Sequence, residues 1–352
     1  MTFDESGQKL SNKESLRRKI SLINDNKWEE FTAHSLGLIG AQSMPSNKRS
    51  NHKSNQNSTD SGFTSLEKNV IFLCSKGDFS KAYATLFPGT PASINESTLD
   101  KLADLHPPED SNSPLEEHIW NFMSDRKIII TEQLVRDYIH KSDHLVGPGP
   151  SFTTIDSFKA MMGSPRSIEG AKFVANLNWL MNFMANEVLP DGMSSLFQFS
   201  TLIALDKGGG KVRPIAMGET LRKMNASLIL KVIDSEVKDF FKGAQYGMDS
   251  MGTEKVIHTN NHVRGQHRDW DTISLDHKNA FNLVKRSVIC TKLQIHFPHV
   301  FNYFRTYYQK SASLFMSDPD TLELYEFFSC CGVQQGCPKG PFLFNLATLD
   351  HI

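Results

Sequence analysis

Residues 205–216 read LDKGGGKVRPIA, with three consecutive glycines between two short runs of strand-forming residues. Glycine readily adopts the positive φ values that tight hairpin turns require, so residues 207–210 are expected to form the tip of a β-hairpin. The runs 199–205 and 211–216 are its two strands. Pro214 has no N–H to donate, which places its strand at the edge of a sheet.

The sequence around this hairpin mixes helical and extended patterns. Residues 165–189 carry apolar side chains at three- and four-residue steps, so we expect a helix that stops before Pro190. Helices are also expected over residues 219–241 and 253–263. Residues 271–276 alternate apolar and polar side chains, which predicts a half-buried strand ending in Asp276. A second hairpin (313–316 with 322–330) and a helix within 338–352 complete an α+β fold.

The composition excludes several classes of protein. The chain has 352 residues with 38 Lys and Arg against 39 Asp and Glu, so it is not a globally basic nucleic-acid-binding protein. Its apolar runs are far shorter than the roughly 18 residues of a membrane span, and the acidic N-terminus has no signal-peptide pattern. We therefore expect a soluble, intracellular protein without a membrane partner. Five cysteines without a Cys-x-x-Cys motif predict free thiols rather than a disulfide framework or a zinc site.

The same composition predicts three parts along the chain. Residues 41–62 contain 12 Ser, Asn and Gln residues and only two apolar ones, too few to offset chain entropy by burial. Residues 1–64 are therefore expected to be a largely disordered segment with a Ser/Asn-rich linker. Residues 65–190 are expected to form a helical extension, and residues 191–352 a mixed α+β unit.

Three segments, in this order, carry a resemblance to one family. They are LDKGGGKVRPIA with GETLR (205–216 and 218–222), SLDHKNAFN (274–282) and GVQQGCPKGPFLFN (332–345). They resemble the fingers, motif A and motif B of a reverse transcriptase of the non-LTR retroelement type. The resemblance covers roughly residues 65–352, and implies the fingers and an incomplete palm of a right-hand polymerase. It also implies a nucleotidyltransferase of a retrotransposon, a transposable element. Such an RNA-directed DNA polymerase uses an RNA template, a primer strand, deoxynucleotide triphosphates and two Mg²⁺ ions.

The resemblance assigns roles to four residues of motifs A and B. Asp276 is implied as the catalytic carboxylate and Mg²⁺ ligand, because two-metal polymerases hold their ions with carboxylates. Phe281 is implied as the steric gate, whose ring would clash with a ribose 2′-hydroxyl. Gln335 and Gly336 are implied to contact the incoming nucleotide, with Gly336 allowing the backbone to come close.

The hairpin supplies the charges that such a site needs for phosphate. Lys207 and Arg213 lie on its two arms, and Arg can bind phosphate oxygens in a bidentate way. Lys211 could take the role of Lys207. Residues 201–231 hold six basic and two acidic residues, a net charge of +4 in a chain of net charge −1. A solvated charged hairpin without function is the alternative.

Some positions depart from the family pattern. The family usually has Asp where Cys337 stands, and apolar residues where Lys339 and His277 stand. Motif C requires an Asp-Asp pair, and the chain contains no such dipeptide and ends eleven residues after Pro341. One palm carboxylate cannot hold two bridging Mg²⁺ ions. We therefore expect a truncated reverse transcriptase, without motif C or thumb and inactive alone. The alternative is a non-catalytic nucleic-acid-binding remnant or a pseudogene-like product.

Overall fold

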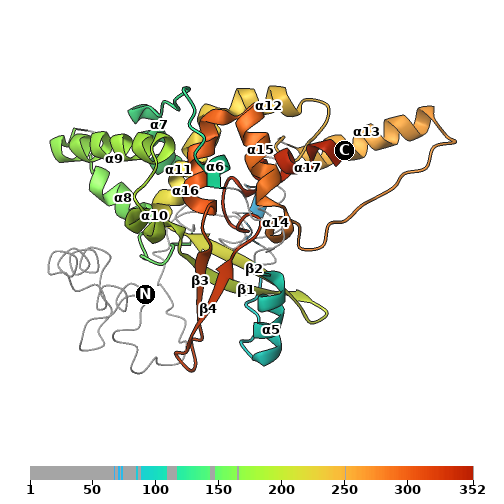
Figure 1. The fold of residues 1–352 in the computed structure, drawn as a ribbon, viewed down its shortest axis with the longest axis horizontal. Coiled ribbons are helices and arrows are strands. Elements are labelled where there is room, and N and C mark those ends of the chain that lie inside the picture. Colours follow the sequence, from blue (N-terminus) through green and yellow to red (C-terminus); the bar gives the residue numbers. More distant parts are fainter. Residues whose placement is uncertain are drawn as a thin grey trace, which may run out of the picture.

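The computed structural model describes residues 89–108, 117–142, 147–164, 166–249 and 251–351, together with the single positions 67, 70, 71, 73 and 85. The expectations for residues 1–64 lie outside the described residues. Among the helices that are described, none is long and apolar enough to cross a membrane. The described residues form a mixed structure of helices and one four-stranded sheet (Figure 1).

A group of helices precedes the sheet. They are α5 (Glu96–Leu105), α6 (Glu117–Trp120), α7 (Glu132–Lys141), α8 (Ile155–Met162), α9 (Ile168–Asn186) and α10 (Asp191–Gln198). Ser167 begins α9, where its hydroxyl accepts the N–H of Gly170 at 3.0 Å and satisfies one of the free donors of the first turn. The helix expected over residues 165–189 is thus confirmed, with shorter ends.

The sheet contains the predicted hairpins. Its strands are β1 (Ser200–Gly208), β2 (Lys211–Gly218), β3 (Ala312–Ser317) and β4 (Leu324–Ser329), in the spatial order β2-β1-β3-β4. β1 pairs with β2 and β3 with β4 in antiparallel fashion, whereas β1 and β3 are parallel. Both hairpins are confirmed, and Pro214 lies on β2, a strand at one end of the sheet, as expected.

The remaining described helices lie after the first hairpin in the sequence, six between the two hairpins and one after the second. They are α11 (Thr220–Val232), α12 (Asp234–Phe241), α13 (Gly252–Gln266), α14 (Ala280–Leu283), α15 (Arg286–His296), α16 (Phe301–Tyr308) and α17 (Gly340–Thr348), with 3₁₀ turns η1 (Pro298–Val300) and η2 (Leu349–His351). The single helix expected over residues 219–241 was wrong: two helices meet at Ile233, whose φ of −96° and ψ of 9° interrupt the helical backbone. The helix expected over 253–263 is confirmed as α13.

Two hydrophobic clusters hold these elements together. The larger one joins helices along most of the described chain, from Trp120 to Ala347. The smaller one lies between one face of the sheet and α5, and it includes Leu102, Leu202 and Leu314. Figure 1 shows the helices above the sheet, with α5 beside β1 and β2.

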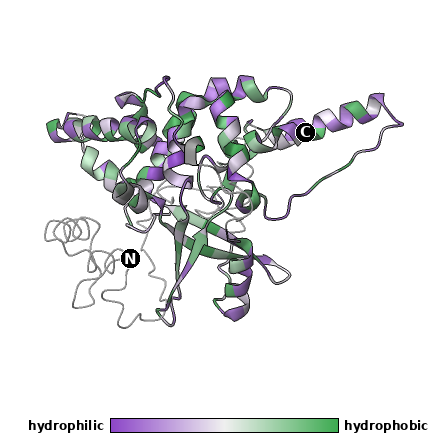
Figure 2. Cartoon of the chain, in the orientation of Figure 1, coloured by the Kyte–Doolittle hydropathy of each residue, from purple (hydrophilic) through white to green (hydrophobic). Residues whose placement is uncertain are grey.

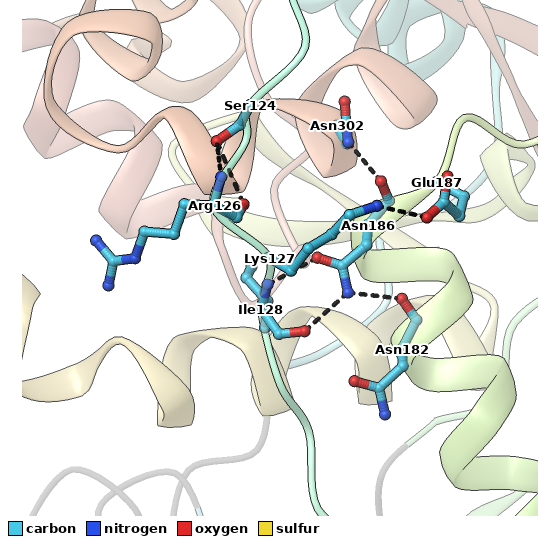
Figure 3. A network of polar contacts seen from close by, with 8 residues as sticks. All are labelled: Ser124, Arg126, Lys127, Ile128, Asn182, Asn186, Glu187 and Asn302. Carbon is cyan, nitrogen blue, oxygen red and sulfur yellow. Dashed lines mark hydrogen bonds and ion pairs between the residues drawn. The ribbon is translucent and has the colours of Figure 1, made fainter.

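Two asparagines of α9 bind an extended segment in the way a neighbouring strand would (Figure 3). Asn186 accepts the N–H of Ile128 at 2.7 Å and donates to its carbonyl at 2.8 Å. Asn182 does the same for Ile130, at 2.9 and 2.8 Å. The two asparagines are four residues apart on the helix, a rise of about 6.0 Å, which is close to the roughly 6.6 Å between alternate residues of an extended chain. Asn302 of α16 then donates to the carbonyl of Asn186 at 2.6 Å.

The strand expected over residues 271–276 was wrong. Residues 271–277 have no regular structure, and their side chains are exposed. Ile273 and Leu275, the apolar residues of the alternating pattern, are 83% and 79% exposed. A strand needs a hydrogen-bonding neighbour, and the described sheet has none beside this segment. Figure 2 shows hydrophobic colour in this run, which returns from the far end of α13.

Candidate functional site

The hairpin tip presents three exposed cations. Lys207, Lys211 and Arg213 are all exposed, and none forms an ion pair within the described part of the chain. The glycines between them have φ values of +79°, +60° and +72°, which side chains rarely adopt. A shift in strand register between Asp206 and Gly208 makes Lys207 the extra residue of a bulge. These charges are therefore available to an anion.

Strand pairing decides which face of the sheet carries Arg213. Arg213 lies opposite Leu205, and directly opposed residues of antiparallel strands point to the same face. The neighbouring pair Ala204 and Pro214 is buried on the other face, toward α5. Arg213 therefore projects from the sheet face that does not pack on α5.

The loop that carries Gln335 and Gly336 is attached to the outer edge of β2. The carbonyl of Gln335 accepts the N–H of Ala216 at 2.7 Å. Gly336 has φ +119°, and a Cβ placed on it would lie 2.4 Å from the carbonyl oxygen of Ala216. Only glycine fits this approach. Arg213 is three residues before Ala216, roughly 10 Å away along the strand.

Phe281 is held by the same loop from the other side. Its carbonyl accepts the N–H of Val333 at 2.7 Å. Its ring stacks on Phe344 of α17 at 5.4 Å between centroids, and a Cβ on Gly340 would lie 3.1 Å from the ring. The ring is only partly buried. The loop therefore connects Phe281, on one side, to the strand that carries Arg213, on the other.

Asp276 stands apart from these contacts. It lies on the exposed segment before α14, five residues before Phe281. The next residue, His277, is the nearest anchored point, with its ring 6.2 Å from that of Phe344. Among the described residues, no group of three or more His, Cys, Asp or Glu side chains is arranged to hold a metal ion. The structure thus joins Phe281, Gln335 and Gly336 through the loop, and it places Arg213 farther along the strand that the loop contacts. It leaves Lys207 at the hairpin tip and Asp276 on an exposed run.

The charge that sequence reasoning grouped around the hairpin is only partly exposed. Arg222 is 2% exposed, and its Nη1 donates to the carbonyl of Gln198 at 3.2 Å. Lys223 donates to the carbonyl of Gly147 and is half-buried, and this burial lowers the pKa of its amine. Summed charge along a sequence does not reveal which side chains face inward. The net charge of residues 201–231 therefore overstates the cation cluster that an anion would meet.

Sequence reasoning missed Arg286, which fixes the base of the loop. Its buried guanidinium donates to the carbonyls of Gly332 at 3.0 Å, Tyr308 at 2.9 Å and Ser329 at 2.8 Å. It therefore ties α15 to α16, to the end of β4 and to the loop. The sequence does contain a signal for this buried position. Arg286 shares a helical face with Ile289, Cys290 and Leu293, and a single charged residue on such an apolar face is unusual.

Residues 205–351 match the family model described as reverse transcriptase (RNA-dependent DNA polymerase). The match supports a reverse transcriptase domain over this stretch, which contains the hairpin cations, Phe281 and the loop with Gln335. The four-stranded sheet with its helices is consistent with part of such a domain. No curated protein matches the chain.

Proposed function

We propose that this chain is part of an RNA-directed DNA polymerase of the non-LTR retrotransposon type, and that residues 205–351 form its nucleotide-binding fingers and a portion of its palm. In this proposal Lys207 and Arg213 bind the triphosphate, and Gln335 and Gly336 face the base or sugar. Phe281 lies under the sugar and selects against a 2′-hydroxyl. The partners are an RNA template, a primer strand and deoxynucleotide triphosphates.

The position of the loop 332–340 supports the proposal. The loop 332–340 contacts both β2, through Gln335 and Gly336, and the backbone of Phe281, through Val333. Residues far apart in the sequence, for which the resemblance implies one nucleotide, are therefore neighbours through direct backbone contacts. Two exposed cations on the same hairpin supply the charge for a polyphosphate.

The described residues do not fit the two-Mg²⁺ centre that reverse transcriptases generally use. Asp276 is exposed, and it belongs to no cluster of potential ligands in the described ranges. We propose that residues 1–352 do not polymerise on their own and that a nucleotide- and RNA-binding activity remains.

A non-catalytic nucleic-acid-binding role is the second candidate function, and the unpaired hairpin cations favour it. Binding through such cations is independent of sequence and weakens with salt, because counterions are released. Affinities of this kind are typically about 10⁻⁴ to 10⁻⁶ M near physiological salt. This role requires no carboxylate partner for Asp276.

Two measurements test these proposals. A titration of triphosphate at low salt should show binding that Arg213→Ala weakens and that Lys231→Ala leaves unchanged, since Lys231 is exposed on α11 and outside the hairpin. Lys223→Ala should also retain binding. If Arg213→Ala and Lys231→Ala weaken triphosphate binding equally, the charged surface is diffuse. If wild type binds no triphosphate, the proposed site is refuted.

A primer-extension assay with a primed RNA, deoxynucleotides and Mg²⁺ addresses catalysis. We expect no extension above background. Extension that disappears in Asp276→Ala would contradict the proposed inactivity and would establish Asp276 as catalytic.

A further inference from the structure

A buried polar cluster lies directly behind the loop that carries Gln335. Arg222 of α11 is 2% exposed, and Lys339, the residue that precedes α17, is completely buried. Cys337, two residues after Gln335, is 8% exposed. The aromatic members come from α16 and are also completely buried: Tyr303, Tyr307 and Tyr308.

The cluster contains two buried amine or guanidinium groups and no carboxylate. Arg222 stands over the ring of Tyr307, 4.7 Å from its centroid, and its Nη2 has no hydrogen-bond partner. The Nζ of Lys339 lies 3.6 Å from the centroid of Tyr303 and likewise has no hydrogen bond. Within the described ranges neither group is paired with Asp or Glu. A buried charge without a counter-ion is strongly unfavourable, so this cluster needs an anion.

Cys337 is the group best able to supply that anion. Its sulfur lies 3.5 Å from the hydroxyl of Tyr303, which can donate to it. A thiol ionises at a lower pH than a phenol, by about 1.5 pKa units in water. A positive charge beside a cysteine stabilises the thiolate, so cysteines next to arginine or lysine have lowered pKa values.

We propose that Cys337 is a buried thiolate that serves as the counter-ion of Arg222, and that Lys339 is neutral beside it. The backbone of Cys337 belongs to the loop, since its N–H donates to the carbonyl of Gln334 at 3.0 Å and its carbonyl accepts from Gly340 at 2.8 Å. Its side chain, buried against Tyr303, therefore anchors the loop to α16. Cys337 is thus a positioning residue for Gln335 and Gly336. The pair exists in the folded chain whether or not nucleotide binds.

The electrostatics of the neighbouring groups agree with this distribution of protons. Burial opposes ionisation of Cys337, but Arg222 and the hydrogen bond from Tyr303 outweigh it, so the pKa of the thiol is lowered. Burial lowers the pKa of Lys339 well below its usual range, against the opposing effect of Cys337. Burial also keeps the pKa of Tyr303 far above its ordinary value.

The other titratable groups that face the cluster do not supply a competing anion. Burial raises the pKa values of Tyr307 and Tyr308, so both phenols stay protonated. Arg286 of α15 lies over Tyr308 at 5.4 Å and adds positive charge. Burial lowers the pKa of the imidazole of His299, so it is neutral near pH 7. The carboxylate beside it, Glu236 at 3.5 Å, forms its ion pair with Arg126 at 2.6 Å.

Ultraviolet absorbance of the thiolate tests the proposal on the full chain. The difference between wild type and Cys337→Ser at neutral pH should show the thiolate band, and the band should disappear on acidification with a midpoint below the ordinary value of about 8.5. Cys290→Ser is the matched control, because Cys290 is also buried and burial raises its pKa to about 12. That control should show no band at neutral pH. Equal difference spectra for the two variants would overturn the proposal.

A second variant keeps the test decisive if Cys337→Ser does not fold. Cys337→Asp supplies a carboxylate in nearly the same place, so it should fold and should melt at a temperature equal to or above that of wild type. The wild-type minus Cys337→Asp spectrum should again contain one thiolate. A fully folded Cys337→Asp with no spectral loss would mean that the wild-type cysteine is a neutral thiol and would refute the pair.

Discussion

Replacing Gly336 by alanine should detach the loop from β2. The new Cβ would lie 2.4 Å from the carbonyl oxygen of Ala216, so the two must move apart by about 1 Å to reach an ordinary contact. That movement breaks the 2.7 Å hydrogen bond between Ala216 and Gln335, which contributes about 1 kcal/mol. A non-glycine residue at φ +119° costs about 1–3 kcal/mol more. We expect a loss of about 2–4 kcal/mol in the free energy of unfolding.

Urea denaturation followed by circular dichroism measures this loss, and Gly209→Ala is the control. Gly209 has φ +60° at the hairpin tip, and a Cβ there would meet nothing within 4 Å. Its substitution should cost only the backbone strain, about 1–2 kcal/mol. If Gly336→Ala unfolds at the same urea concentration as Gly209→Ala, the close approach does not stabilise the loop and the reasoning is wrong.

Three further changes should give measurable effects. Arg286→Met removes the side-chain donor to three carbonyls and should lower the free energy of unfolding by about 3 kcal/mol in urea titrations, whereas Lys285→Met, at the exposed neighbouring position, should have little effect. Asn186→Leu removes both side-chain bonds to Ile128 and should cost about 2 kcal/mol, measured by thermal melting, against no loss for exposed Asn176→Leu. Because the pKa of Cys337 is lowered in the folded chain, wild type should have a larger free energy of unfolding than Cys337→Ser, and the difference should be complete above about pH 8.5. The difference should vanish as pH falls through the folded-state pKa. A difference that grows on acidification would contradict the lowered pKa.

Local signals predicted the hairpin and the loop well. Three consecutive glycines at residues 208–210 readily adopt the positive φ values of a hairpin turn, as they do here, so the tip could be located without knowledge of the rest of the chain. The same holds for Gly336, whose neighbour Gln335 was expected near a nucleotide and does contact the hairpin strand.

Features that depend on distant partners could not be predicted. The alternation at residues 271–276 is typical of a strand, but a strand forms only where a neighbour offers hydrogen bonds, and none of the described strands does so. The burial of Arg222 and Lys339 depends on tyrosines about 30 to 90 residues away in the chain. The helix break at Ile233 also could not be predicted, because no glycine or proline lies there.

The asparagine contacts of α9 have a consequence for the cooperativity of unfolding. The amide of Asn186 holds residue 128, its backbone carbonyl holds α16, and Trp120 stacks on Phe304 of the same helix at 5.9 Å. Residues before the family match thus share one hydrophobic cluster with residues inside it. Their amide protons should exchange with solvent through a common opening, as one foldon. A polypeptide that starts at residue 205 would leave α16 without the helix that covers it.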